Sequence, residues 1–203
     1  RLVLDSVTLT SANGSPLVVT AADEVVLVLA DGSTNTITDT SAHLKSDDPD
    51  EPNAAIFSMA DLTIAGTGTL RVTSNNADAI ASKDGLVVSS GTLALTAGDD
   101  GLRGKDYVII EGGTIDVKSG GDAIKSTNET DDTVGLVMIN AGSVSLNAGD
   151  DAIHAEGDLV VAGGELTVTS SVEGLEGANV VIAGGQTSII SSDDGLNTKS
   201  GTT

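Results

Sequence analysis

Residues 99–106 read Asp99-Asp100-Gly101-Leu102-Arg103-Gly104-Lys105-Asp106, and altered copies of this stretch return along most of the chain. Each copy places an acidic residue two positions before an apolar residue, which we call the anchor. The clear anchors are Ile80, Leu102, Ile124, Ile153, Leu175 and Leu196, and two less regular copies have anchors at Leu17 and Ile56. From Ile80 onward, successive anchors are 22, 22, 29, 22 and 21 residues apart. A nearly fixed period of this size indicates a repeat architecture.

Each repeat carries two further runs of alternating apolar residues around a glycine-containing turn. After Leu102 these are the run 108–110, the turn Gly112-Gly113 and the run 115–117. Alternation with period two predicts strands, and the glycines predict tight turns. Three short strands in about 22 residues form one turn of a solenoid, with neighbouring coils ~4.8 Å apart. We therefore predict an all-β fold, a right-handed, single-stranded parallel β-helix of about seven coils.

The chain of 203 residues contains no linker-like run, so we expect a single domain over residues 1–203. Two acidic loop insertions interrupt the repeat, at residues 39–52 and 127–133. A β-propeller needs ~40 residues per repeat, and a β-sandwich gives no reason to repeat one motif at a fixed spacing. Aromatic residues make up only 1% of the chain, so the core must consist of valine, isoleucine, leucine and alanine.

The chain is strongly acidic, with 9 lysines and arginines against 30 aspartates and glutamates and a formal net charge of −21. Such a field repels nucleic acids and anionic membranes and attracts cations. No apolar run approaches the ~18 residues of a membrane span, so we expect no membrane insertion. Cysteine is absent, which excludes thiolate chemistry. The chain begins inside a strand-like pattern without a signal peptide, and we interpret it as a mature or trimmed product.

Stacked repeats bring equivalent acids together in what we call the acid column, two residues before the anchors. Its members are Asp78, Asp100, Asp122, Asp151, Glu173 and Asp194. The preceding position adds Asp99, Asp150 and Asp193, and Asp84 and Asp106 follow their anchors. Carboxylates ~4.8 Å apart repel each other by roughly 1 kcal/mol even in water. A calcium ion with oxygen ligands at ~2.3–2.6 Å fits between two of them. We therefore predict calcium as the cofactor and these eleven acids as its ligands; a solvated acidic turn is the alternative.

Three bases occupy the position after the anchor in consecutive repeats, Arg103, Lys125 and His154. We call them the basic column. With Lys105 and Tyr107 nearby, they predict a groove that binds a negatively charged polymer through calcium and charged hydrogen bonds. The alternative, which the sequence leaves open, is local ion pairing that offsets the acid column.

Several segments of the chain resemble those of a known protein family. They are residues 99–106, 111–115, 154–156 and 173–177, together with Glu51-Pro52-Asn53-Ala54-Ala55-Ile56-Phe57-Ser58. These segments are similar to those of the bacterial secreted carbohydrate-binding domain-containing proteins. The resemblance implies a parallel β-helix of the pectate lyase type, bound calcium, and affinity for cellulose and acidic polysaccharides such as polygalacturonate. It also implies an extracellular location. Three coils depart from the family's usual Asp-Gly-Ile, because alanine replaces glycine at Ala79, Ala123 and Ala152.

We expect calcium-dependent, non-catalytic binding of an acidic polysaccharide, and favour polyuronates over cellulose because aromatic rings for sugar stacking are scarce. Two alternatives remain. One is a polysaccharide lyase, in which Lys125, Arg103 or Lys105 removes a proton next to a uronate carboxylate. The other is a structural subunit of an extracellular filament that assembles head to tail.

Overall fold

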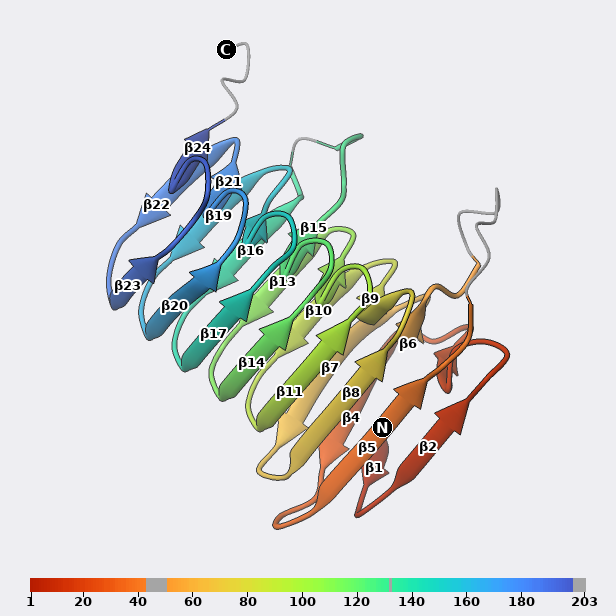
Figure 1. The fold of residues 1–203 in the computed structure, drawn as a ribbon. Coiled ribbons are helices and arrows are strands. Elements are labelled where there is room, and N and C mark those ends of the chain that lie inside the picture. The colour runs from red at the N-terminus through yellow and green to blue at the C-terminus, as the bar shows by residue number, and fades with distance from the viewer. Residues whose placement is uncertain (43–50, 132, 199–203) are drawn as a thin grey trace.

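The computed structural model describes residues 1–42, 51–131 and 133–198, and every regular element in these ranges is a β-strand. The strands form three parallel sheets of eight strands each (Figure 1). The first sheet contains β1 (Leu2–Leu4), β4 (Glu24–Leu29), β7 (Asp61–Gly66), β10 (Gly85–Val88), β13 (Tyr107–Ile110), β16 (Leu136–Ile139), β19 (Asp158–Val161) and β22 (Asn179–Ile182). The second contains β2 (Thr8–Ser11), β5 (Thr34–Asp39), β8 (Thr69–Ser74), β11 (Thr92–Ala97), β14 (Thr114–Lys118), β17 (Ser143–Asn147), β20 (Glu165–Ser170) and β23 (Gln186–Ile189). The third contains β3 (Leu17–Val19), β6 (Ala54–Ser58), β9 (Asp78–Ser82), β12 (Leu102–Gly104), β15 (Ile124–Ser126), β18 (Ile153–His154), β21 (Leu175–Gly177) and β24 (Leu196–Thr198).

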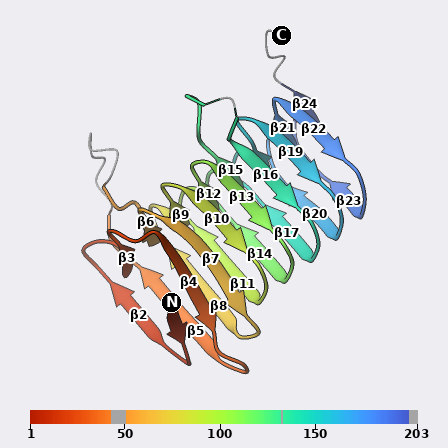
Figure 2. The ribbon, with the colours of Figure 1, turned by 180° about the vertical axis from the view of Figure 1, so that it is seen from behind.

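The chain contributes one strand to each of the three sheets in turn, so every three consecutive strands form one coil of a solenoid. Figures 1 and 2 show the coils stacked side by side, with the first and last coils at opposite ends. This confirms the parallel β-helix. The described residues form eight coils rather than about seven, because the less regular repeats at Leu17 and Ile56 each complete a coil of their own. The hand of the winding stays a prediction.

All eight anchors pair in one row of the third sheet, from Leu17 through Ile56 to Leu196. The repeat read from the sequence is therefore the structural register. The 29-residue step from Ile124 to Ile153 keeps this pairing because its extra residues form a loop between β15 and β16.

The core is a narrow apolar column that runs the length of the stack. In β14, Ile115 and Val117 are buried while Thr114, Asp116 and Lys118 are exposed, which is the alternation that predicted the strand. Like residues of successive coils meet, since Ile115 lies between Leu93 and Val144. No helix in the described part of the chain has the length and hydropathy to cross a membrane.

The structure describes both predicted insertions only in part. Asp39, expected to open the first loop, instead ends β5, where it is buried and its Oδ1 accepts a hydrogen bond of 2.8 Å from the Ser41 backbone N–H. Residues 43–50 of that loop and residue 132 of the second lie outside the described residues. The residues of the second insertion that the structure describes lie between β15 and β16.

Candidate functional site

The acid column stands where the chain enters the third sheet, and its first four members are buried. Asp78, Asp100, Asp122 and Asp151 are 1%, 6%, 2% and 7% exposed. In Asp78, Asp100 and Asp122, one carboxylate oxygen accepts the backbone N–H of the next member of the column. These hydrogen bonds measure 3.1 Å from Asp100 to Asp78, 2.9 Å from Asp122 to Asp100 and 2.9 Å from Asp151 to Asp122. The column therefore connects the coils, a role that the sequence did not reveal.

Burial disfavours the charged form of these carboxyl groups. It raises the pKa of Asp78 to about 7, although the Arg103 guanidinium partly offsets the effect. Burial raises the pKa of Asp100 to about 6 against the attraction of Lys125. The pKa of Asp151 is raised by burial and by the charge of Asp122. The column therefore attracts either protons or cations.

The basic column lies beside the acid column, because Arg103, Lys125 and His154 pair in register on β12, β15 and β18. An Arg103 guanidinium nitrogen lies 2.7 Å from an Asp78 carboxylate oxygen, and the Lys125 ammonium lies 2.6 Å from Asp122. These contacts support the reading of the basic column as local ion pairing.

Lys125 and His154 each face two rungs of the acid column. The Lys125 ammonium also lies 4.0 Å from Asp100, and His154 Nδ1 lies 3.3 Å from Asp151 and 4.0 Å from Asp122. Burial alone would lower the pKa of Lys125, but its hydrogen bond with Asp122 and the charge of Asp100 outweigh burial and raise it. Lys125 is thus held as a cation.

Three groups of side chains place one potential ligand atom each within 4.8 Å of one another. The groups are Asp78/Asp99/Asp100, Asp122/Asp151/His154 and Asp151/Glu173/Glu176. The first two include carboxylates that already bind Arg103 and Lys125. The third group, which we call the Glu173 cluster, consists of carboxylates, as the first does, and shares Asp151 with the second.

Two neighbouring carboxylates of the Glu173 cluster share a hydrogen bond. This bond with Glu176 raises the pKa of Glu173, while a hydrogen bond of 2.7 Å from the Asn197 side chain to Glu173 opposes the shift. Two carboxylates can share a hydrogen bond only when one holds a proton, and a cation between them would take that proton's place. Glu176 was not among the predicted ligands. No pattern in the sequence indicated it, because its position pairs with His154 of the basic column.

Five of the eleven predicted calcium ligands fall outside these groups. Asp150, Asp193 and Asp194 are exposed at the turns that precede the third sheet. Asp84 and Asp106 lie at a different corner, where the chain passes from the third sheet to the first. None of the five joins a group of three close ligand atoms in the described ranges.

Tyr107 lies at this second corner, together with the exposed Lys105, and not beside the basic column. Its hydroxyl donates a hydrogen bond of 3.0 Å to Asp61 Oδ1, which also accepts the Gly85 backbone N–H at 2.9 Å. The ring packs on Gly85, where any Cβ would collide with it. Burial and the hydrogen bond to Asp61 raise the pKa of Tyr107. The five predicted polysaccharide-binding residues therefore form two groups.

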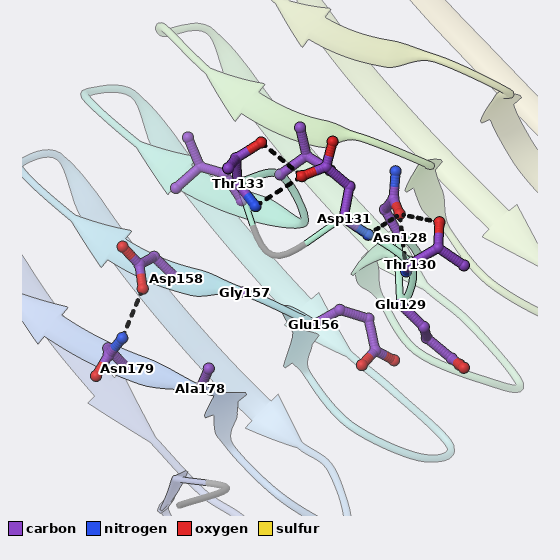
Figure 3. Close-up of a pocket in the computed structure, with 12 residues that line it drawn as sticks. Asn128, Glu129, Thr130, Asp131, Thr133, Glu156, Gly157, Asp158, Ala178 and Asn179 are labelled. Atoms are coloured by element: carbon purple, nitrogen blue, oxygen red, sulfur yellow. Dashed lines mark hydrogen bonds between the residues drawn. The ribbon is translucent and has the colours of Figure 1, made fainter. Parts of the chain in front are cut away.

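A cleft of about 920 Å³ opens beside the second insertion (Figure 3). We call it the insertion cleft. It is lined by Asn128, Glu129, Thr130, Asp131, Thr133, Val134, Leu136, Glu156, Gly157, Asp158, Ala178 and Asn179. The sequence predicted the insertion, but a concavity depends on where the loop lies against the coils, which no local pattern encodes.

Comparison with known proteins gives one family and one related fold. The family model described as "Carbohydrate-binding domain-containing protein" matches residues 1–203. A curated relative with the same description, from Acetivibrio thermocellus, is 36% identical over 97 residues, which are 47% of this chain and 34% of that protein. The matched region thus spans about a third of that relative. A solved structure of "the polysaccharide lyase-like protein from C. thermocellum, Gadolinium derivative" has a TM-score of 0.76 and 32% identity, covering 91% of this chain and 77% of that chain.

Proposed function

We propose that this chain, which belongs to the carbohydrate-binding domain-containing protein family, binds acidic polysaccharide through calcium ions on its acid column. One observation carries the proposal: rows of carboxylates in register, with ligand atoms within 4.8 Å of one another in three places. The family membership confirms the resemblance seen in the motifs. It is also the reason that we propose a carbohydrate as the ligand. The calcium and the acidity of the polymer are our inference from the charge and the geometry.

The Glu173 cluster fits a calcium ion best. Its candidate ligands Asp151, Glu173 and Glu176 all offer hard carboxylate oxygens, which calcium prefers. The solved relative is described as a gadolinium derivative. Gadolinium(III), like calcium, is a hard cation that takes oxygen ligands.

An acidic polymer suits this surface better than a neutral glucan. Neutral sugars usually stack on aromatic rings, but Phe57 is fully buried and Tyr107 is half-buried on Gly85. A protein with a net charge of −21 repels a polyuronate unless cations intervene. Calcium that binds carboxylates of both partners removes this repulsion. Because calcium is abundant outside cells, we place the function there, with cellulose as the second substrate to test.

The experiment is binding of polygalacturonate, measured by calorimetry in calcium and in chelator. We expect binding in calcium, loss of binding in chelator, and at least a tenfold loss for Glu176→Gln. The matched control is Glu165→Gln, an equal charge change at an exposed position of β20. Absence of polygalacturonate and cellulose binding in both buffers would refute the proposal.

The lyase alternative finds less support in the geometry. A base that abstracts a proton must itself be deprotonated, but Lys125 is held as a cation by Asp122. Arg103 is committed to Asp78. Incubation with polygalacturonate should therefore give no absorbance from unsaturated products, and a rise in this absorbance would restore the lyase.

A further inference from the structure

We propose that the outward face of the first sheet is an interface between two copies of this chain, which pack side by side as a dimer with two-fold symmetry. The dimer requires neither calcium nor carbohydrate. It concerns the first sheet, whereas the acid column and the basic column lie at the third.

The strands of the first sheet are apolar on both faces. In β13, Val108 and Ile110 are buried in the core, and Ile109 between them points outward and is partly exposed. In β10, β16 and β19, one apolar residue likewise points outward between two buried ones. Strands that are buried on both faces carry such continuous apolar runs, whereas strands with one face in water alternate apolar and polar residues. The second sheet shows the alternating pattern, for example in β14.

The outward residues of successive coils lie in one row, which we call the outer strip. The register of the first sheet places them side by side at ~4.8 Å per coil, from β4 to β22 (Figure 2). Its apolar members are Val26, Val87, Ile109, Met138, Val160 and Val181, and Thr63 is the one polar position. Val181 is 48% exposed, and the other five are partly exposed. An apolar row of this length on a surface marks an interaction site.

The chemistry of the outer strip fits another sheet better than a sugar. Sugars stack on flat aromatic rings, but every apolar member of the strip is aliphatic. Aliphatic side chains interdigitate when two sheets pack face to face. A second copy brings the same row with the same spacing between coils, so the side chains of one strip fit between those of the other.

Charge favours this face over the rest of the surface. Each copy has a net charge of −21, so two copies repel each other wherever acidic surfaces meet. No member of the outer strip is charged. Contact there removes apolar surface from water without bringing carboxylates together.

The two edges of the first sheet select the orientation of the copies. The edge where its strands begin carries Glu24, Asp61 and Asp158, and the opposite edge carries neutral residues such as Ser89 and Asn140. A two-fold axis parallel to the solenoid places the acidic edge of each copy against the more neutral edge of the other. An axis across the solenoid would bring the two acidic edges together. In the parallel arrangement, each residue of the outer strip faces the same residue of the second copy.

The size of the face predicts a weak dimer. With ~4.8 Å per strand and ~3.3 Å per residue, the face is on the order of 35 Å long and 13 Å wide. Two copies would bury roughly 1,000 Å² between them, which is near the lower limit for a specific interface. We therefore expect an equilibrium that depends on concentration, with a dissociation constant in the micromolar range.

The interface does not include the third sheet, so each copy keeps its acid column. A dimer presents two such columns, and a long polymer that contacts both gains avidity. This consequence rests on the proposed function, whereas the dimer itself does not.

The test is sedimentation equilibrium of the full chain in chelator, from about 1 to 200 μM. We expect a monomer–dimer equilibrium that shifts toward the dimer as salt rises from about 50 to 500 mM, because salt screens the net charge. Ile109→Glu places two like charges opposite each other and should weaken the dimer at least tenfold. Ala94→Glu adds the same charge at a partly exposed outward position of β11 in the second sheet, and should leave the dimer unchanged. The melting temperatures of both variants check that they are folded.

Cross-linking tests the orientation, because the chain contains no cysteine. Val26→Cys and Val160→Cys lie toward opposite ends of the outer strip. Each should form a covalent dimer with a short bis-maleimide, since each residue faces itself across the interface. Ala94→Cys, on the second sheet, should form none.

Three outcomes would overturn the proposal. The first is a monomer at every concentration and salt, and if Ile109→Glu then abolished polysaccharide binding, the strip would be a sugar-binding face. The second is equal weakening by Ile109→Glu and Ala94→Glu. The third is cross-linking of Val26→Cys with Val160→Cys in a mixture but of neither with itself. Calcium-dependent binding of polygalacturonate by a monomer removes only the dimer, and a dimer that binds no polysaccharide removes only the proposed function.

Discussion

The backbone N–H of Asp122 donates a hydrogen bond of 2.9 Å to Oδ1 of Asp100, which lies one coil earlier in the stack. The same bond joins Asp100 to Asp78 and Asp151 to Asp122. Each of these carboxylates therefore has two different oxygens. In Asp78, Asp100 and Asp122, Oδ1 accepts the backbone N–H of the next coil, and Oδ2 faces Arg103 or Lys125 of the basic column.

This division predicts opposite results for two changes at Asp100. Asp100→Asn keeps the accepting oxygen, so we expect the free energy of unfolding to change by less than about 1 kcal/mol. Asp100→Ala leaves the buried Asp122 N–H without an acceptor, so we expect a loss of about 1–3 kcal/mol. Urea denaturation in chelator measures both. Asp99→Ala, at the exposed neighbouring position, serves as the control. Equal losses for the asparagine and alanine variants would show that the charge, not the hydrogen bond, stabilises the column.

The same burial predicts that stability falls as the pH rises in chelator. The folded-state pKa is about 7 for Asp78 and about 6 for Asp100, above the ordinary aspartate pKa of 3.8. Between these values the folded protein binds more protons than the unfolded chain, so the free energy of unfolding decreases with pH. The stabilisation is complete below about pH 4 and is lost as the pH passes through 6 to 7. Thermal melting at pH 5 and pH 8 measures the difference.

A variant separates this effect from general charge repulsion. Asp78→Asn should reduce the difference between pH 5 and pH 8, whereas Asp116→Asn, at an exposed position of β14, should leave it nearly unchanged. If the melting temperature of the unmodified protein rises between pH 5 and pH 8 in chelator, the buried carboxyl groups do not control it.

The sequence was sufficient to predict the register of the fold. A solenoid repeats one local environment, so the period of anchors such as Leu102 and Ile124 is also the pairing of their strands. The same logic placed Arg103 beside Lys125 and Asp100 beside Asp122. Positions along the stack follow from counting residues, because each coil adds nearly the same number.

Other features depend on the direction in which a side chain points within its coil. The spacing of residues in the sequence does not determine that direction. The repeat could not show that Asp100 turns one oxygen toward the Asp122 backbone. It could not separate Asp106, at one corner, from Asp100, at another. Glu176 was missed as a candidate ligand because the three preceding positions of its column are Arg103, Lys125 and His154, and only the folded structure brings its carboxylate to Glu173.

Calcium should stabilise the folded protein if the Glu173 cluster binds it. A ligand at one hundred times its dissociation constant adds about 2.7 kcal/mol of stability, which corresponds to an increase of roughly 5–10 °C in melting temperature for a chain of this length. Glu173→Gln should remove most of the increase, because it removes one of the three carboxylates. Differential scanning calorimetry with and without calcium tests this. An unchanged increase in Glu173→Gln would place the ion elsewhere on the acid column.

Substitution of two glycines tests how closely successive coils pack at the corner between the first and second sheets. Gly142 has a φ of 100°, and a Cβ there would lie 2.7 Å from the carbonyl oxygen of Gly113 in the preceding coil. Gly142→Ala therefore combines an unfavourable backbone conformation with a steric clash, and we expect a loss of roughly 2–3 kcal/mol in the free energy of unfolding. Gly112 offers the matched control, because a Cβ there would have its nearest contact at 3.6 Å, with the Ser89 carbonyl oxygen. Gly112→Ala should leave stability unchanged or raise it by up to about 1 kcal/mol, since alanine restricts the unfolded chain. Urea denaturation compares the two variants. If they lose equal stability, the stacked turns adapt to a side chain, and close approach of successive coils at this corner is not what requires glycine.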